Sequence, residues 1–348
     1  MEHLSKRSPL CKKLYLLLLY SFCITSLLCG CSAAQEPISR SGFYFDTIVQ
    51  ITIYDASKEN CLDECLKLAK QYEEMLSPTL EGSDIWKINH SGGMPVTVSP
   101  ETATLLATAL SYCDITDGRI DLTMETVSRL WDFHAEDITA DILPANRLPD
   151  ESALANALSH VDYHNLVIEN NTVTLLDPES AISLGFIAKG YIADKMKEYL
   201  LSQHIESAII NLGGNLLAIG QKPDGTPFQF GIQKPFDEHG TPITVLSVSD
   251  QSIVSSGVYE RYFYQDDVLY HHILNTANGY PVQNRLFGVT ILSDSSVTGD
   301  ALSTTCFVLG LEDGMALIES LDDAEAIFIT DDYHLHYSSG LSHLSDLP

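Results

Sequence analysis

In the stretch Ser183-Leu-Gly-Phe-Ile-Ala-Lys-Gly-Tyr-Ile-Ala-Asp194, a strand-like run passes into a helix. The apolar spacing that follows predicts this helix over 187–203. Lys189 would then lie in its first two turns, where an ammonium group can bind phosphate and the helix N-terminus adds partial positive charge. Because a single lysine on a helix is usually just solvated, this stretch indicates a phosphate site only in combination with others.

Short β-like runs surround this stretch, and few helical patterns separate them. Further helices are predicted over 60–76, 100–116 and 300–320, the second with Ser99 as N-cap and Pro100 as first residue. Strands are predicted over 43–54, 166–168, 172–176, 207–212, 228–233, 252–257, 268–274, 286–293 and 325–329. Because strands and helices do not alternate regularly, the pattern indicates an α+β fold and argues against a doubly wound parallel sheet.

The first 30 residues have the pattern of an export signal. Basic residues up to Lys13 precede an apolar run over 14–28. The run ends in Leu28-Cys-Gly-Cys-Ser32, which resembles a bacterial lipoprotein signal with Cys31 as the lipidated residue, palmitate included. An uncleaved anchor is the alternative. We expect a protein tethered at the extracytoplasmic face of the cell membrane, divided into a signal peptide (1–30), a linker (31–41) and one domain (42–348).

The charge of the chain excludes one class of partner. Its 348 residues include 47 acidic and 19 basic side chains, for a net charge of −28. A nucleic-acid partner is not expected, because neutralising phosphates requires a basic surface. Four cysteines lie beyond the N-terminal segment, at positions without zinc-site spacing, and we expect them to be small buried side chains: Cys61, Cys65, Cys113 and Cys306.

Oxygen-bearing side chains gather in the run Gly299-Asp-Ala-Leu-Ser-Thr-Thr305. Asp300, Ser303 and Thr304 have the spacing i, i+3, i+4, so one face of a helix would present a carboxylate and two hydroxyls. One interpretation is a helix cap, since acids and hydroxyls favour helix N-termini. The other is a Mg²⁺ site, since this cation prefers oxygen ligands and often shares substrate phosphates.

Three further runs place glycine or histidine beside β-like segments. The double glycine in Asn211-Leu-Gly-Gly-Asn215 is either a tight turn or a close approach of backbone to a ligand. In Ser255-Ser-Gly-Val-Tyr-Glu-Arg261, we interpret Glu260 and Arg261 as a local ion pair. His271 and His272 are neighbours in a predicted strand, so only one can face a shared site, where it could accept a proton.

In order and identity, these runs resemble one family, the ApbE-type FAD:protein FMN transferases. The similarity extends from about Phe43 to Phe328. No single motif is decisive, but eight in the same order are specific. The motifs are Phe45-Asp-Thr47, Ser83-Asp-Ile-Trp-Lys-Ile-Asn89, Gly118-Arg-Ile-Asp-Leu-Thr123 with Leu130-Trp131, Ala188-Lys-Gly-Tyr191 with Asp194, Asn211-Leu-Gly-Gly-Asn215, Ser256-Gly257 with Tyr259-Glu-Arg261, His272-Ile273 with Gly279-Tyr-Pro281, and Asp300-Ala-Leu-Ser-Thr304.

The resemblance implies a fold and a reaction. The fold would be of α+β type, related to the T-fold, with mixed sheets and helices and a flavin cleft between two subregions. The reaction would split FAD, join FMN through a phosphoester to a threonine or serine hydroxyl of a target protein, and release AMP. The partners would be FAD and acceptor flavoprotein subunits or FMN-binding domains that carry the target threonine.

The resemblance also implies roles for particular residues. Mg²⁺ would be held by the side chains of Asp300, Ser303 and Thr304 and by the backbone carbonyl of Phe186. His272 would be the base that accepts the proton of the acceptor hydroxyl. FAD would contact Phe45, Thr79, Arg119, Ile120, Asp121, Ser183, Lys189 and Leu274.

Two other functions fit the same residues. In a FAD pyrophosphatase the site would be the same, but water would take the place of the acceptor hydroxyl. In a non-catalytic flavin-binding lipoprotein the site would bind flavin without any reaction. A lipid-anchored solute-binding protein without chemistry is a third hypothesis, which rests on the N-terminal signal alone.

Overall fold

The computed structural model describes residues 36–131, 133, 147–237 and 240–344. The predicted signal peptide and Cys31 lie outside the described residues. From Pro37 onward the chain forms one unit, and the fold is described for that unit alone.

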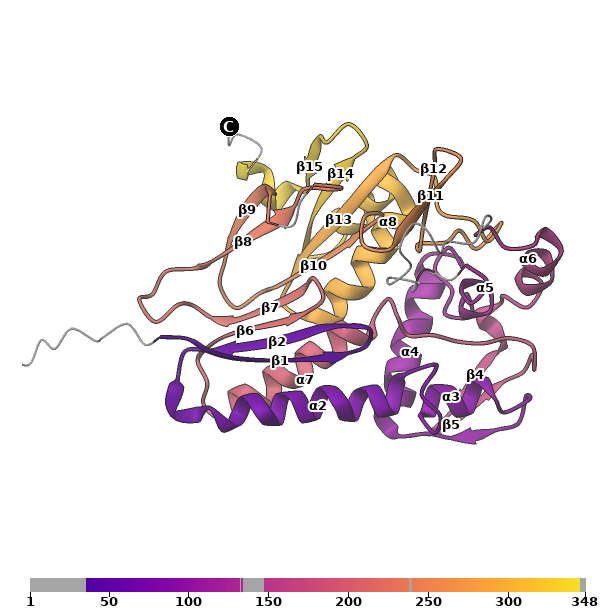
Figure 1. Ribbon diagram of the computed structural model, residues 1–348, viewed down its shortest axis with the longest axis horizontal. Coiled ribbons are helices and arrows are strands. Elements are labelled where there is room, and N and C mark those ends of the chain that lie inside the picture. The colour runs from indigo at the N-terminus through magenta and orange to yellow at the C-terminus, as the bar shows by residue number, and fades with distance from the viewer. Residues whose placement is uncertain (1–35, 132, 134–146, 238–239, 345–348) are drawn as a thin grey trace, which may run out of the picture. The chain divides into compact units, whose positions relative to one another are not determined.

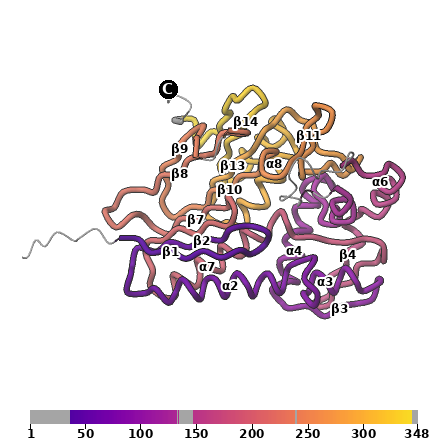
Figure 2. Tube along the Cα trace, in the orientation of Figure 1, coloured from indigo at the N-terminus to yellow at the C-terminus, as the bar shows by residue number. Residues whose placement is uncertain are grey.

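An antiparallel sheet of eight strands is the centre of this unit, with the order β1-β2-β6-β7-β10-β13-β14-β15. Alternation of apolar and polar residues explains the half-buried strands, as in β6, where Ala208, Ile210 and Leu212 are buried. Figure 2 shows β2 beside β6, as the pairing of Val49 with Leu212 requires. The bounds are β1 Ile38–Tyr44, β2 Thr47–Ile53, β6 Ser207–Leu212, β7 Asn215–Gly220, β10 Ser252–Gly257, β13 Leu286–Ser293, β14 Ala324–Thr330 and β15 Leu335–Tyr337.

Three long helices, α2 (Asn60–Leu76), α7 (Ala188–Ser202) and α8 (Ser296–Glu319), pack against this sheet. In Figure 1, α2 and α7 run beneath β1, β2 and β6, and α8 lies against β10 and β13. In α7 the fully buried side chains Ile192, Met196 and Leu200 recur at helical spacing. Burial of these faces forms the main hydrophobic core between helices and sheet.

A second subregion follows the first long helix in the sequence and lies at the right in Figure 1. It holds α3 Asp84–Asn89, α4 Pro100–Ile115, α5 Glu125–Ser128, α6 Glu151–Leu158 and a small sheet of β3 Val96–Thr97, β5 Thr172–Leu175 and β4 Leu166–Glu169. Two separate antiparallel ribbons are β8 Phe228–Gln233 with β9 Pro242–Val248, and β11 Tyr262–Gln265 with β12 Val268–His271. Short 3₁₀ turns are η1 Ala56–Lys58, η2 Tyr163–Asn165 and η3 Ser339–Leu344.

Helices α7 and α8 approach each other unusually closely at Gly190. A Cβ atom at this position would lie 2.2 Å from the carbonyl oxygen of Ser296 and 2.7 Å from Cβ of Asp300. These atoms belong to the backbone of α8 or are attached directly to it, so moving them would require a shift of the whole helix. The glycine is therefore required for this helix crossing.

Each of these two helices caps the other. The carboxylate of Asp300 on α8 accepts a hydrogen bond of 2.8 Å from the Gly190 amide in the first turn of α7. The carboxylate of Asp194 on α7 accepts bonds from the amides of Ser296 (2.8 Å) and Val297 (2.9 Å) in the first turn of α8. These amides have no partner within their own helices, and the acids favour the positive ends of the helix dipoles.

The predicted elements are confirmed in large part. The α+β fold class is confirmed, α2 has the predicted bounds, and Ser99 caps α4 by accepting a bond from the Thr102 amide. The four cysteines beyond the N-terminal segment are buried and free, as expected: Cys61, Cys65, Cys113 and Cys306.

Other boundaries were wrong. The strand predicted over 43–54 is a hairpin, because Phe45 and Asp46 turn the chain with φ of 54° and 55°. Strand β1 begins at Ile38, so the last residues of the predicted linker 31–41 belong to the sheet. The strand predicted over 268–274 ends at His271. The helix predicted over 300–320 begins at Ser296, which places Asp300 in its second turn rather than at its start.

Helix α8 is also, among the described residues, the one helix long and apolar enough to cross a membrane by length and composition. Half of its most apolar window is buried inside the protein, where Cys306 and Phe307 are fully enclosed. Gly310 interrupts it with φ 85° and ψ 179°. Packing in the core accounts for its apolar composition.

We expect Gly190→Ala to destabilise the protein by about 2 kcal/mol or more, because the new methyl overlaps the backbone of α8. Gly185→Ala is the matched control, since its Cβ would meet only the Ser183 hydroxyl at 3.5 Å. The control should change stability by less than about 0.5 kcal/mol. Urea unfolding of both variants measures the difference, and equal stabilities would contradict the close crossing.

Candidate functional site

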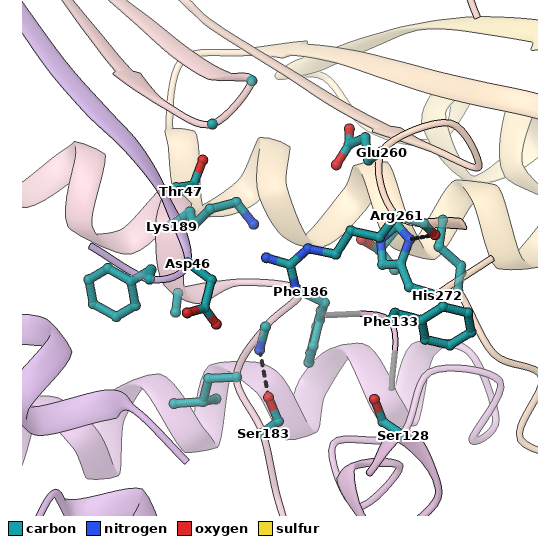
Figure 3. A pocket seen from close by; sticks show the side chains of 18 of the residues that line it. Asp46, Thr47, Ser128, Phe133, Ser183, Phe186, Lys189, Glu260, Arg261 and His272 are labelled. Carbon is teal, nitrogen blue, oxygen red and sulfur yellow. Dashed lines mark hydrogen bonds between the residues drawn. The ribbon is translucent and has the colours of Figure 1, made fainter. Parts of the chain in front are cut away.

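A cavity of about 1230 Å³ opens between the large sheet and the second subregion. Figure 3 shows side chains from both parts pointing into it. Its walls come from seven separated segments and two residues of α8: 45–47, 73–80, 119–133, 183–189, 213–216, 231–233, 253–276, Thr304 and Val308. The fold thus gathers at one place nearly every motif that the sequence singled out.

All eight residues predicted to contact FAD line this cavity. They are Phe45, Thr79, Arg119, Ile120, Asp121, Ser183, Lys189 and Leu274. Of the other predicted site residues, His272, Phe186 and Thr304 also line it. Asp300 and Ser303 are buried behind the wall, with Asp300 only 3% exposed. Their roles toward a ligand stay predictions.

The first turn of α7 carries positive charge to the cavity wall. Lys189 is the second residue of this helix, and its Nζ lies 4.0 Å from Oδ1 of Asp300. The other carboxylate oxygen of Asp300 accepts the bond from the Gly190 amide. Because Asp300 already caps this helix N-terminus, a phosphate group in the cavity would be bound mainly by the ammonium group of Lys189.

Three hydroxyl-bearing side chains, Ser256, Ser303 and Thr304, meet at the second turn of α8. The Ser256 hydroxyl lies 2.8 Å from that of Ser303 and 3.1 Å from that of Thr304. The Ser303 hydroxyl also donates to the carbonyl oxygen of Asp300, at 2.9 Å. Ser256 was missed as a site residue, although it stands in the run from Ser255 to Arg261 at the end of β10.

These oxygens are of the type that Mg²⁺ prefers, and their donor set fits a site completed by substrate phosphates. Across residues 36–131, 133, 147–237 and 240–344, no three His, Cys, Asp or Glu side chains gather closely enough to hold a metal ion. A cation here would depend on the single carboxylate of Asp300, on hydroxyl and carbonyl oxygens, and on the ligand.

The segment 119–123 is held in place largely by its own side chains. Asp121 accepts bonds from the Thr123 amide (2.7 Å) and hydroxyl (2.6 Å) and from the Tyr163 amide (2.9 Å). Burial raises the pKa of this carboxyl group above its ordinary value, although these hydrogen bonds act in the opposite direction. Both oxygens of Asp121 thus have protein partners, so its carboxylate shapes this wall.

Three other predicted contacts have local partners as well. Arg119 forms an exposed ion pair of 2.9 Å with Asp313 on α8. The Ser183 hydroxyl accepts a bond from the Gly185 amide at 3.2 Å, drawn in Figure 3. The Thr79 hydroxyl lies 3.2 Å from that of Ser77. These exposed or short polar side chains can exchange partners when a ligand enters.

The two histidines face different surroundings, although only His271 lies in a strand. His271 is buried, with Nε2 3.1 Å from the Val282 carbonyl oxygen. His272 follows the end of β12 and lines the cavity, with Nδ1 3.3 Å from the Arg261 carbonyl oxygen. That contact favours the tautomer with the proton on Nδ1, which leaves the Nε2 lone pair available. Desolvation, with the nearby His271, Arg261 and Lys189, lowers the pKa of His272 to about 3.

Glu260, for which the sequence predicts a local ion pair, lines the cavity. Its side chain is exposed to solvent there, and Figure 3 shows it above Lys189 and Arg261. Desolvation raises its pKa to about 7, against the lowering influence of Lys189 and Arg261. Only the side chain's position in the fold shows that it faces the same space as His272.

Comparison with known proteins gives one consistent result. A family model described as "ApbE family" matches residues 45–328. The FAD:protein FMN transferase of Klebsiella pneumoniae is 36% identical over 278 residues, which cover 78% of this chain and 83% of the relative. The FAD:protein FMN transferase of Treponema pallidum is 31% identical over 333 residues, or 90% of each chain.

Solved structures agree. The ApbE protein of Thermotoga maritima superimposes with a TM-score of 0.78 at 28% identity, over 88% of this chain and 99% of the other. The flavin transferase ApbE of Vibrio cholerae gives a TM-score of 0.76 at 29% identity, with the same coverage. The resemblance inferred from the motifs and the mixed α+β fold are both confirmed.

The raised pKa of Glu260 predicts a pH-dependent stability. Between pH 4.5 and about 7 the folded state binds this proton more tightly than the unfolded chain, so stability falls as the pH rises through that range. Glu260→Gln, which stays neutral, should melt at a higher temperature than the wild type at pH 8 and at a similar temperature at pH 5. Glu312→Gln, an exposed position on α8, is the control. A difference in melting temperature between Glu260→Gln and the wild type that is the same at pH 5 and pH 8 would show that the ionisation of Glu260 is not its cause.

Proposed function

Because the chain belongs to the ApbE family of FAD:protein FMN transferases, we propose that it transfers FMN from FAD to a threonine or serine hydroxyl of a target protein and releases AMP. The observation that supports this most directly is the composition of one cavity wall. The wall holds all eight predicted flavin contacts, Lys189 among them, together with His272.

The transfer is a displacement at phosphorus. The acceptor hydroxyl oxygen forms a bond to the FMN phosphorus, and the bond from that phosphorus to the bridging oxygen of the pyrophosphate breaks. AMP leaves with the bridging oxygen, and the hydroxyl proton passes to Nε2 of His272. Such a reaction depends mainly on in-line positioning and on neutralising charge at the phosphate oxygens.

The chain's own residues supply much of this positioning. The ammonium group of Lys189 would bind the pyrophosphate, and the Arg261 carbonyl orients the ring of His272. Asp300, Ser303, Thr304 and the Phe186 carbonyl would hold Mg²⁺. When bound, Mg²⁺ acts as a Lewis acid on the phosphate oxygens.

We further propose that the mature chain is a lipoprotein anchored through Cys31 at the extracytoplasmic face of the membrane. Its acceptors would then be exported flavin-carrying subunits of membrane redox complexes, or FMN-binding domains of extracytoplasmic reductases. The support is the sequence of residues 1–32, which precedes the described fold.

Mass spectrometry tests the reaction. The chain from Ser32 onward, mixed with FAD, Mg²⁺ and a purified FMN-binding domain that carries a target threonine, should add an FMN-sized mass to that domain. A threonine-to-valine acceptor is the control and should gain nothing. AMP and free FMN without an adduct would instead identify a pyrophosphatase, and neither product would leave a binding protein. His272→Ala should lose transfer while still binding FAD.

Two aspartates separate the metal role from the capping role. Asp300→Asn keeps a carbonyl oxygen for the Gly190 amide but loses its charge, so it should fold and lose at least about 100-fold of its Mg²⁺-dependent turnover. Asp194→Asn removes the charge from the cap at the N-terminus of α8. It should lower the stability of the protein without the loss of Mg²⁺-dependent turnover. Turnover against Mg²⁺ concentration distinguishes them, and wild-type turnover in Asp300→Asn would contradict the proposed metal site.

A further inference from the structure

Six aromatic rings form a continuous row that meets the cavity wall in its middle and continues outside it at both ends. We define this aromatic row as Tyr259, Tyr262, Tyr264, Phe236, Phe287 and Tyr333. Their ring centroids lie 5.8 Å apart for Tyr262–Tyr264, 5.3 Å for Tyr262–Phe236, 6.3 Å for Tyr259–Phe236, 5.1 Å for Phe236–Phe287 and 5.2 Å for Phe287–Tyr333. Nearly all these pairs meet edge to face, a favourable geometry for aromatic rings.

The row is exposed at its ends and reaches the cavity in its middle. Tyr264 is 60% exposed, and Tyr262 and Tyr333 are each 40% exposed. Tyr259 and Tyr262 line the cavity, whereas Tyr264 and Tyr333 do not. A ligand confined to the cavity therefore cannot use the whole row, but a chain that enters the cavity from outside can.

The backbone at the centre of the row is strained. Phe236 has φ of 58°, in the left-handed region that a bulky side chain rarely occupies. Such a conformation costs on the order of 1–3 kcal/mol and persists only where surrounding contacts compensate for it. Here it places one ring against Tyr259, Tyr262 and Phe287 at once.

The row shares its support with the candidate base. Tyr262 and Tyr264 lie on β11, and His272 directly follows the paired strand β12, with its amide bonded to the Arg261 carbonyl at 3.1 Å. The alternating side chain Phe263 lies on the opposite face of this ribbon, where it packs on Phe133. The open face of the ribbon therefore leads along the row to His272.

We propose that the aromatic row is the docking surface for the acceptor protein. The acceptor would place apolar side chains that flank its target hydroxyl on Tyr262, Tyr264 and Tyr333, while the hydroxyl itself enters the cavity beside His272. Aromatic rings with few charges are typical of the energetically dominant centres of protein interfaces. The proposal rests on the proposed transfer to a protein hydroxyl.

A comparison of a large and a minimal acceptor tests it. The large acceptor is the purified FMN-binding domain used above, and the minimal acceptor is N-acetyl-threonine amide, which is too small to reach from the cavity to Tyr264 or Tyr333. In the double variant Tyr264→Ser/Tyr333→Ser, KM for the domain should rise about tenfold or more with kcat retained. Transfer to the minimal acceptor and FAD affinity, measured by flavin fluorescence, should stay unchanged.

Phe43→Ser is the matched control, because Phe43 is a 67% exposed aromatic residue outside the row. It should leave KM for the domain unchanged, and thermal unfolding should show that all variants fold. An unchanged KM in the double variant, or a parallel loss of FAD affinity, would overturn the docking proposal alone. A dimer of the wild type that the double variant abolishes would show that a second copy covers the row. Absence of transfer to either acceptor by the wild type would overturn the proposed function, and the docking proposal with it.

Discussion

The close crossing of α7 and α8 is the constraint on which the site depends. Because Gly190 has no side chain, the two helices pack more closely than any larger residue would allow. Each helix then supplies a carboxylate that accepts hydrogen bonds from the N-terminal amides of the other. Asp194 fixes where α8 begins, and Asp300 fixes where α7 begins. The same contact therefore determines the positions of Lys189 on one helix and of Ser303 and Thr304 on the other, so the stability of the core and the geometry of the site have a common origin.

This arrangement changes how the carboxylate of Asp300 is understood. The two interpretations of its sequence run, a helix cap and a cation ligand, looked like alternatives. The structure shows that Asp300 caps a helix, but the helix is α7 rather than its own, and one carboxylate oxygen remains at 4.0 Å from Lys189. A carboxylate with one oxygen committed to an amide is held in a fixed orientation. The capping role is therefore compatible with the metal role proposed for it.

Much of this could be predicted from sequence, for physical reasons that differ between elements. The bounds of α2 and the Ser99 cap follow from local spacing and local hydrogen bonds. The start of α8 could not be predicted in this way, because its cap, Asp194, is about a hundred residues away. The hairpin at Phe45 and Asp46 has neither glycine nor asparagine at its positive φ angles, so a single aspartate is its only turn signal. Ser256 and Glu260 join the site through the antiparallel pairing of β10 and the turn that follows, which local sequence does not determine.

The buried cysteines make the fold indifferent to the redox state of its surroundings. Burial raises the pKa values of the Cys65, Cys113 and Cys306 thiols to about 12, and Cys61 is enclosed beside Cys65 on α2. Oxidation and disulfide exchange both proceed through the thiolate, which is scarce under these conditions. The four free cysteines of the described domain form no disulfide, so its fold does not depend on an oxidising compartment.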